Sequence, residues 1–393
     1  MLKNKMKSMF FIIPMFLALI IGASVYIYFR LRPLLPEPGT WMSIVAKCVY
    51  VIVFFSYIVG FMLQRDGHYA LSTPFLHVGA WMLAATLYFV LIFVFIDIVR
   101  GINAFTFKAE ILTFRYRYGD SGGHLWSLVG CIATALVLIC GYFNAKFPTT
   151  THLTYKTDKE ISKDFKYVLI SDVHLGMINC DKFMSVLKDR INAENPDFVV
   201  IAGDFFDGDP EPVINSNVGA ILREIKTGYG IFAVNGNHEW IGNANVADEF
   251  LVKHGVTVLR DSSARLPFGV TIVGREDFSA GRPGGKRIGR KPLAEVVSNI
   301  DRNDYTILLD HQPKNLDEAA ESGAIDIELL GHTHAGAQLW PMFLLSGSMF
   351  ENDYGQYRKL NTDFYTTSGY GTWGPPIRTS ARPELVVIET MKE

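Results

Sequence analysis

The distribution of hydrophobic residues divides the chain into two parts of different construction. In the first 143 residues the apolar residues form long runs, whereas the rest alternates short apolar runs with polar turns. Four long runs reach the roughly 20 residues that a membrane-spanning helix needs. They are residues 9–29, 41–63, 74–99 and 125–143. Because these runs lack the polar face of a soluble helix, they predict a four-helix transmembrane domain over residues 1–147.

The first run could instead be a signal peptide, because Lys3, Lys5 and Lys7 precede it. Its apolar region is too long for that interpretation, and three further runs follow. Lys and Arg are shared equally between the two sets of flanks, so the positive-inside rule leaves the orientation undecided. Ionisable residues are nearly absent from the runs, which argues against a pore or pump. We therefore expect a multi-pass anchor in the cell (inner) membrane, with the lipid bilayer as a partner.

From Lys166 onward, short β-type runs alternate with helical segments. Strands are expected at 167–170, 198–202, 231–234, 306–309 and 325–330, with another in the C-terminal ELVVIET. Helices are expected at 181–193, 218–226, 246–254, 293–300 and 316–321. This alternation predicts an α/β layered domain over residues 167–393. Residues 148–166 are polar and rich in Thr and Lys, and we interpret them as a linker.

Charge and cysteine content narrow the function only slightly. A net charge of −2 gives no indication of a nucleic-acid partner. Three of the four cysteines lie in apolar runs and only Cys180 lies in the second part, so no disulfide within that domain is possible. Cysteine usage therefore does not identify the compartment. The oligomeric state stays open.

Five successive strands each deliver a metal-binding type of residue into the following loop. These residues are Asp172, His174, Asp204, Asn237, His238, His311, His332 and His334. Loops at the carboxyl ends of strands are where α/β folds place their sites. Oxygen and nitrogen ligands without a thiolate suit Mn, Fe or Zn. A lone buried histidine such as His311 is more often structural, but the whole series in this order predicts a metal centre.

The number of candidate ligands exceeds what a single ion needs. Two divalent ions roughly 3.5–4 Å apart, bridged by one carboxylate, would use about this many. Such a pair clamps a phosphoryl group and lowers the pKa of a bridging water, which yields hydroxide. A histidine beside the ions can protonate the leaving oxygen. The constellation therefore suggests phosphoryl chemistry.

The motifs DVH (172–174), GDFFD (203–207), GNHE (236–239), a strand-end His311 and GHTH (331–334) resemble those of the calcineurin-like metallophosphoesterases. The resemblance extends from about Tyr167 to Ile388. It implies a four-layer α-β-β-α sandwich with two metals at its rim. It assigns the first metal to Asp172, His174 and His334, the second to Asn237, His311 and His332, and the bridge to Asp204. It also implies that His238 protonates the leaving group or positions the phosphate, and that Asp207 and Glu239 orient ligands.

Finer features resemble a bacterial subgroup of membrane-associated phosphoesterases, some of which act on phospholipids or on UDP-diacylglucosamine. These features are DHQP at 310–313, GHTHAG at 331–336 and the C-terminal PPIRTSARPELVVIE. The subgroup usually has Gly-Gly-Gln after the second histidine, whereas this chain has Ala335-Gly336-Ala337-Gln338. The glutamine is displaced by one residue, which puts its role in substrate contact in doubt.

The apolar run from Trp340 to Leu345 follows the last histidine closely. It is either a buried strand or core loop, or a lipid contact, and Pro341 argues against a strand. Arg378 is a candidate phosphate contact, with a surface ion pair as the alternative, and Arg275 is a second candidate.

Together these features predict a membrane-anchored hydrolase of a lipid or lipid-linked phosphate ester or pyrophosphate, acting through a metal-bridging hydroxide. One alternative is the same chemistry on a soluble phosphodiester or phosphoprotein. Another is a non-catalytic membrane sensor or scaffold.

Overall fold

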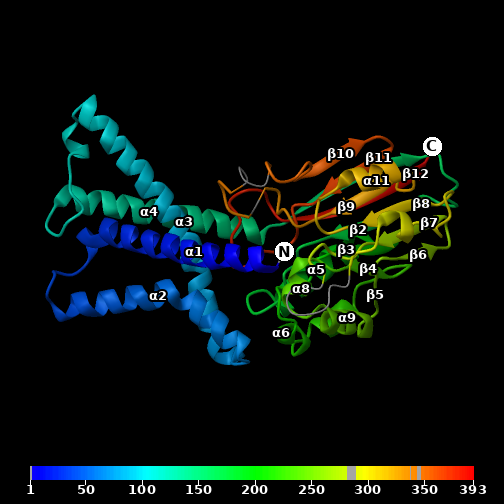
Figure 1. Ribbon diagram of the computed structural model, residues 1–393, viewed down its shortest axis with the longest axis horizontal. Coiled ribbons are helices and arrows are strands. Elements are labelled where there is room, and N and C mark those ends of the chain that lie inside the picture. Colours follow the sequence, from blue (N-terminus) through cyan, green and yellow to red (C-terminus); the bar gives the residue numbers. More distant parts are fainter. Residues whose placement is uncertain (1, 281–288, 337, 343–346) are drawn as a thin grey trace. The chain divides into compact units, whose positions relative to one another are not determined.

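The computed structural model describes residues 2–280, 289–336, 338–342 and 347–393 (Figure 1). The chain forms two compact units that divide between Cys140 and Gly141. Each unit has its own packing, and each is described by itself.

The first unit is helical. Its long helices are α1 (Leu2–Leu31), α2 (Trp41–Arg65), α3 (Tyr69–Phe105) and most of α4 (Ser121–Lys146), with short 3₁₀ turns at Arg32–Leu34 and Glu110–Leu112. Among the residues searched, α2, α3 and α4 are long and apolar enough to cross a membrane. The predicted spans 41–63, 74–99 and 125–143 lie within them. The predicted span 9–29 lies within α1, and the total of four spans stays a prediction.

Small residues allow α2 and α3 to pack closely. A Cβ on Gly79 would lie 2.2 Å from the backbone nitrogen of Tyr57, and one on Gly60 would lie 2.8 Å from that of Leu76. The hydroxyl of Ser72 donates to the carbonyl of Gly60 at 2.7 Å. Such close backbone approach is typical of helix pairs in a membrane.

The second unit contains two six-stranded sheets. The first has the order β1 (Thr149–Thr157), β12 (Glu384–Lys392), β2 (Phe165–Ile170), β3 (Phe198–Ala202), β4 (Ile231–Val234) and β5 (Val256–Val258). The second has the order β10 (Gly355–Lys359), β11 (Thr362–Thr366), β9 (Ile327–Leu330), β8 (Tyr305–Leu309), β7 (Val270–Gly274) and β6 (Ser262–Leu266). Strands β2, β3 and β4 are mutually parallel, as are β7, β8 and β9. Their carboxyl ends therefore fall at one edge of each sheet.

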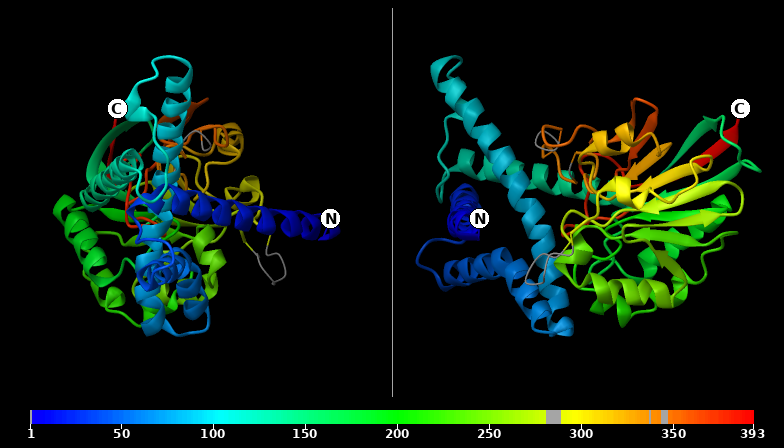
Figure 2. Two further views of the ribbon diagram at one scale, coloured as in Figure 1. Left: turned by 90° about the vertical axis from the view of Figure 1, so that its left-hand side faces the viewer. Right: turned by 45° about the vertical axis from the view of Figure 1, so that its right-hand side comes forward.

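Helices cover the outer face of each sheet, and the sheets face each other (Figure 2). The helices are α5 (Asp181–Glu194), α6 (Glu211–Ile214), α7 (Val218–Leu222), α8 (Asn237–Ile241), α9 (Ala244–Lys253), α10 (Leu293–Val296) and α11 (Leu316–Ser322). Residues of both sheets, among them Leu169, Val200 and Ile307, form the core between them. Because the strands are buried on both faces, they appear in the sequence as continuous apolar runs.

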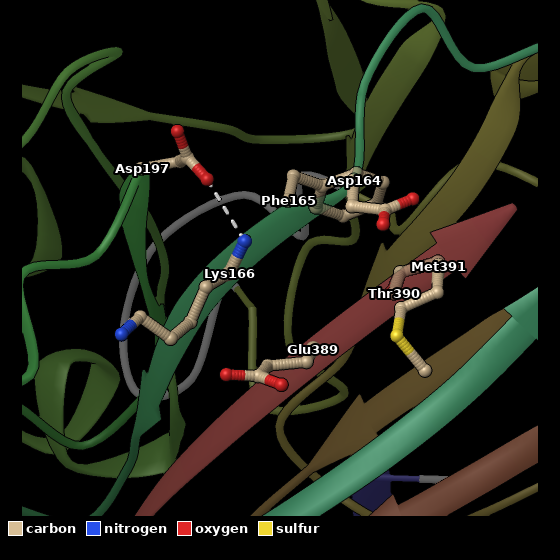
Figure 3. Close-up of a pocket in the computed structure, with 7 residues that line it drawn as sticks. All are labelled: Asp164, Phe165, Lys166, Asp197, Glu389, Thr390 and Met391. Carbon is tan, nitrogen blue, oxygen red and sulfur yellow. Dashed lines mark hydrogen bonds between the residues drawn. The ribbon is translucent and has the colours of Figure 1, made fainter.

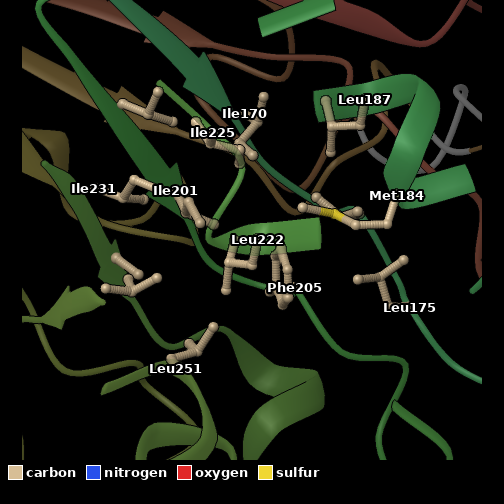
Figure 4. Packing of buried hydrophobic residues seen from close by; sticks show 14 of the residues in the cluster. Ile170, Leu175, Met184, Leu187, Ile201, Phe205, Leu222, Ile225, Ile231 and Leu251 are labelled. Atoms are coloured by element: carbon tan, nitrogen blue, oxygen red, sulfur yellow. The ribbon is translucent and has the colours of Figure 1, made fainter. Parts of the chain in front are cut away.

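Two further cores lie outside the sheets. Ile170 and Ile201 pack against Met184 and Leu187 of α5 on the outer face of the first sheet (Figure 4). Leu308 and Leu330 pack against α10 and α11 on the other side. The predicted four-layer α-β-β-α sandwich is confirmed.

The interpretation of residues 148–166 as a linker is wrong for most of its length. Residues Thr149–Thr157 form β1, which pairs in parallel with β12 from Thr149↔Glu384 to Thr157↔Lys392. As an edge strand β1 is half exposed, so it carries polar residues that resemble a linker. Two sequence features indicate a strand here, namely the Thr-rich composition and the apolar residues Leu153 and Tyr155 two positions apart. Both apolar residues pack against the core between the sheets.

The predicted strands at 198–202 and 231–234 match β3 and β4, and the other predicted strands overlap β2, β8, β9 and β12. Strands β5, β6, β7, β10 and β11 were not predicted. The predicted helices at 218–226 and 293–300 are shorter in the structure, because α7 ends at Leu222 and α10 at Val296.

Candidate active site

The ends of five strands bring the predicted ligands to one edge of the sandwich. In the first sheet, β2 leads into Asp172 and His174, β3 into Asp204, and β4 into Asn237. In the second sheet, β8 leads into His311 and β9 into His332 and His334. All seven predicted ligands and His238 gather there, in clusters of potential metal-binding atoms or in direct contact with them.

One cluster consists of Asp172, His174 and His334, which are all buried. The Nε2 atoms of the two histidines lie 3.1 Å apart. An Oδ1 atom of Asp172 lies 3.4 Å from Nε2 of His334 and 3.8 Å from Nε2 of His174. The hydroxyl of Ser171 and the backbone N–H of His332 donate to the Asp172 carboxylate, which fixes its orientation.

A second cluster consists of Asp204, His311 and His332. Nε2 of His311 lies 3.1 Å from Oδ2 of Asp204 and 3.2 Å from Oδ1 of Asn237. Asp204 also belongs to a third group, with His174 and His238, so the clusters are continuous. Asp204 is therefore shared by the second cluster and the third group, and His174 links that group to the first cluster.

The donor atoms fit a pair of cations. Nδ1 of His311 lies 2.8 Å from the carbonyl of Ala202, which can only accept, so Nδ1 carries a proton and Nε2 is directed at Asp204. Burial disfavours the charged ring, but Asp204 raises the pKa of His311 well above its usual range. A lone pair facing a carboxylate is stable only with a proton or cation between them. The same holds for the two facing Nε2 atoms of His174 and His334. This set of oxygen and nitrogen donors suits Mn, Fe or Zn.

The backbone is strained at five of the seven predicted ligands. Asp172, His174, Asp204, His332 and His334 have φ angles between 49° and 72°, in the left-handed region. Such conformations cost roughly 1–3 kcal/mol each and cluster at functional sites. The surrounding packing therefore holds these residues in place at the expense of stability.

Glycines let the ligand loops approach one another. A Cβ on Gly331 would lie 1.9 Å from the hydroxyl oxygen of Ser171, and one on Gly236 would lie 2.2 Å from Oδ1 of Asp204. No other residue fits at these two positions without displacing a candidate ligand or its partner. This explains the glycine that opens each of the motifs GNHE and GHTH.

Two carboxylates brace the ligands. Glu239 is buried and accepts the backbone N–H groups of Asp204, Phe206 and Gly236. An Oδ1 atom of Asp207 lies 3.1 Å from Nδ1 of His238 and 3.6 Å from Nδ1 of His174. Both residues thus have the orienting contacts that the resemblance implies.

The pKa shifts of three histidines at the site differ in direction, being upward for His238 and downward for His332 and His334. Burial disfavours the charged form of His238, but Asp204 and Asp207 raise its pKa to about 9. Burial and then His311 lower the pKa of His332 to about 4, and burial and then Arg378 hold the pKa of His334 well below its usual range. Neutral imidazoles are the form that binds metals. His332 and His334 are therefore held in that form.

Comparisons with known proteins agree with this geometry. Residues 165–336 match the family model of the calcineurin-like phosphoesterases. A metallophosphoesterase of Aquifex aeolicus is 33% identical over 230 residues, which cover 57% of this chain and 84% of that protein. The chain belongs to the calcineurin-like metallophosphoesterase family.

Two longer matches include the helical unit. A metallophosphoesterase of Campylobacter jejuni is 29% identical over 97% of this chain and 98% of its own length. A transmembrane protein with a metallophosphoesterase domain from Danio rerio is 25% identical over 94% of this chain and 87% of its own length. Together with the three apolar helices, these matches indicate a membrane-associated metallophosphoesterase, a metal-dependent hydrolase of phosphoric esters.

The position of Arg378 agrees with neither of its two predicted roles, a phosphate contact or a surface ion pair. Its side chain is completely buried, so it is neither a surface ion pair nor an exposed phosphate contact. The guanidinium donates to the carbonyls of Ser368, Gly369 and Gly371 and lies 2.9 Å from Nδ1 of His334. Arg378 therefore contacts the metallophosphoesterase site through Nδ1 of the candidate ligand His334.

The prediction of Arg275 as a substrate residue is wrong. Arg275 is 2% exposed, and its side chain interacts with Asp261, Glu318 and the carbonyl of Lys291. The two carboxylates neutralise the positive charge of Arg275 inside the sandwich. The motif GRED gave no indication of burial, because its acidic neighbours in space come from distant segments.

Gln338 also has a structural role. Its amide donates to the carbonyl of Pro375 at 2.6 Å, and its side-chain oxygen accepts the backbone N–H of Trp373. Trp340 and Met342 are 51% and 40% exposed, so this part of the apolar run is neither a buried strand nor a core loop. Phe343, Leu344 and Leu345 lie outside the described residues.

Three residues near the metallophosphoesterase centre were not predicted. The ring centroid of Trp373 lies 6.4 Å from that of His238, and the ring of Phe350 lies 5.7 Å from that of His332. Nζ of Lys314 lies 6.0 Å from the Phe350 ring and is hydrogen-bonded to Gln312. Lys314 follows His311 by three residues, but nothing in the pattern distinguishes it from a solvated lysine.

A surface pocket of about 270 Å³ lies elsewhere on this unit (Figure 3). Its lining includes Phe165 and Lys166 at the start of β2 and Asp197 at the start of β3. The candidate ligands follow the other ends of these strands. The pocket therefore belongs to the opposite end of the sandwich and is no part of the metal site.

Proposed function

We propose that this protein is a dinuclear metal-dependent phosphoesterase whose substrate is a lipid or lipid-linked phosphate ester or pyrophosphate. The observation that carries the proposal is the continuous series of ligand clusters, linked through His174 and Asp204. In this proposal Asp172, His174 and His334 hold one ion, and Asn237, His311 and His332 hold the other, with Asp204 shared. Mn, Fe and Zn are all compatible with these ligands.

The ions would supply charge neutralisation at the phosphoryl group and an activated water. The chain itself would supply the proton for the leaving oxygen. His238 is the donor, because Asp207 engages its Nδ1 and leaves Nε2 for the substrate. The carboxylate of Asp207 on Nδ1 favours the protonated form of this imidazole.

The surroundings of the ligand clusters favour an amphipathic substrate. Trp373 is half exposed beside His238, and Phe350 lies beside His332. Lys314 is fixed by Gln312, whose amide in turn donates to Asp277. Among the described contacts Lys314 has no carboxylate partner, so its charge is available to a phosphate oxygen. Aromatic surface and a cation suit a phosphorylated lipid headgroup.

We further propose a multi-pass anchor in the cell (inner) membrane. The support is the three apolar helices α2–α4 and the predicted fourth span in α1. An anchored enzyme would meet a lipid substrate by diffusion within the bilayer. Protease accessibility of the second unit in intact cells would determine its side of the membrane.

The test uses the full chain in detergent micelles with Mn²⁺ and an aryl phosphodiester. Asp204→Ala and Asn237→Ala should each reduce hydrolysis by at least roughly 100-fold, because loss of a metal contact costs more than loss of an outer partner. Asp189→Ala is the matched control, since Asp189 is an exposed carboxylate on α5. Full activity of the Asp204→Ala protein would refute the proposal.

The lipid part is tested separately. Membrane lipids incubated with the enzyme and Mn²⁺ are compared by mass spectrometry with lipids treated with Asp204→Ala. We expect one phosphorylated lipid class to be consumed only by the unchanged enzyme. Hydrolysis of aryl esters without any change in the lipids would favour the soluble-substrate alternative.

A further inference from the structure

The last turns of α4 are part of the second unit. The backbone N–H of Arg378 donates to the carbonyl of Gly141 at 2.9 Å, and the side-chain amide of Asn144 donates to the carbonyl of Arg378 at 3.0 Å. The oxygen of the same amide accepts from Nε of Arg382. A Cβ on Gly141 would lie 2.8 Å from a methyl group of Thr379, so the helix end and the segment 377–379 are in close contact.

The side chain of Arg378 extends from this segment to the ligand loops. It is completely buried and holds the loop 368–371 through the carbonyls of Ser368, Gly369 and Gly371. A buried guanidinium usually has a carboxylate partner, but the hydrogen bonds of Arg378 go to carbonyls and to the ring of His334. Such an arrangement suits a clamp that fixes backbone geometry.

The clamped loop supports the other candidate ligand of the same cluster. The N–H of Gly371 donates to the carbonyl of Asp172 at 2.7 Å, and the N–H of Tyr370 donates to the carbonyl of Ser171 at 2.9 Å. A Cβ on Gly369, whose φ is +75°, would lie 2.7 Å from Cβ of Asp172. The strained backbone of Asp172 therefore rests on the loop that Arg378 holds.

We propose that Arg378 is a positioning residue that connects the last turns of α4, from Gly141 onward, to Asp172 and His334, so that this helix end sets the metal affinity of their cluster. The proposal rests on the proposed function, because it assumes that these two residues bind a metal. It adds that the last turns of α4 contribute to the geometry of the catalytic unit.

The hydrogen bonds from Arg378 to the loop 368–371 can persist when His334 binds a metal. Its Nη2 atom has two hydrogens but three neighbours within reach, the carbonyls of Gly369 and Gly371 and Nδ1 of His334. When Nε2 of His334 binds a cation, Nδ1 must carry a proton and cannot accept. The two carbonyls then take both hydrogens and the clamp on the loop stays intact, while Nη2 and the protonated Nδ1, now both donors, must separate beyond 2.9 Å.

The experiment compares Asn144→Ala with Asn192→Ala in the full chain in detergent. Asn192 is a matched control, because its amide also donates to a backbone carbonyl, that of Glu224, and also accepts from one group, the N–H of Lys226. Binding of Mn²⁺ is measured by titration calorimetry on metal-free protein. We expect Asn144→Ala to weaken the binding of one of the two Mn²⁺ ions about tenfold, as for loss of a residue that orients a metal ligand. The affinity for the other ion should stay unchanged.

Three outcomes are informative. A selective loss of one ion's affinity in Asn144→Ala, with Asn192→Ala like the unchanged protein, supports the connection. Equal Mn²⁺ binding by all three proteins, or equal weakening in both variants, overturns it. Absence of Mn²⁺ binding by the unchanged protein would instead refute the proposed function. Arg378→Lys, which keeps the charge but replaces the planar guanidinium fork with a single ammonium group, should show the same selective loss.

Discussion

His238 and Asp207 form the pair on which the proton transfer depends. The imidazole is 18% exposed at its side chain and is held through Nδ1 by the carboxylate of Asp207. The backbone N–H of His238 donates to Oδ1 of Asp204, which ties the proton donor to the shared ligand. A donor fixed in this way needs no reorientation during the reaction.

We expect His238→Gln to lower kcat by roughly 10²–10⁴-fold for an ester with an alkyl leaving group, because an alkoxide requires a proton on departure. The loss should be much smaller for a nitrophenyl ester, whose leaving group departs as a stable anion. His254→Gln is the control, since His254 packs on Phe250 outside the ligand clusters. Loss of bound metal in His238→Gln, measured by elemental analysis, would instead assign His238 as a ligand.

At the scale of elements, β1 completes the first sheet. It shields one side of β12 along nine residue pairs, from Thr149↔Glu384 to Thr157↔Lys392. The hydroxyl of Thr151 also donates to the buried carboxylate of Glu384, which receives the N–H of Ser368 in the loop held by Arg378. The edge strand therefore supports the same loop from the other side.

A truncated chain that begins at Asp158, directly after β1, should be less stable than one that begins at Gly141. Without β1, β12 becomes an unprotected edge, and the partly buried side chains of Leu153 and Tyr155 are lost. Full burial of one such side chain is worth about 1.5–3 kcal/mol, so with these two only partly buried the free energy of unfolding should fall by roughly 1–3 kcal/mol. Thermal denaturation followed by circular dichroism measures this, and equal melting temperatures would contradict it.

At the scale of the whole molecule, a membrane protein carries exposed apolar residues in the segment that follows its candidate ligands. Trp340 and Met342 lie six and eight residues after His334, and the N–H of Trp340 donates to the hydroxyl of Thr379. Exposed apolar groups tied to the segment 377–379, next to Arg378, are suited to insertion into a lipid interface. This favours the lipid substrate over a soluble one.

Replacing both Trp340 and Met342 with Ser should lower the rate on phospholipid vesicles about tenfold, since partial burial of two apolar side chains is worth about one factor of ten. Hydrolysis of a soluble aryl phosphodiester should stay the same. Val252→Ser is the control, because Val252 is 60% exposed on α9. Equal losses on both substrates would show that the segment supports the site and does not contact lipid.

The sequence by itself determined the features that depend on local periodicity. Apolar runs located α2, α3 and α4, and buried runs located β3 and β4 at their observed bounds. It also indicated that the residues after these strands would meet, because parallel strands end at a common edge. The seven predicted ligands are indeed neighbours.

Tertiary structure alone decided the features that depend on partners distant in the chain. β1 resembled a linker because its pairing partner, β12, lies more than 200 residues away. Arg378 and Arg275 were predicted to face substrate, yet both are buried by segments that no local pattern connects to them. Arg378 in particular meets the helix end at Gly141 and the ring of His334 only after folding. Periodicity fixes which face of an element is buried, whereas the packing of distant segments fixes what each buried polar group must bind.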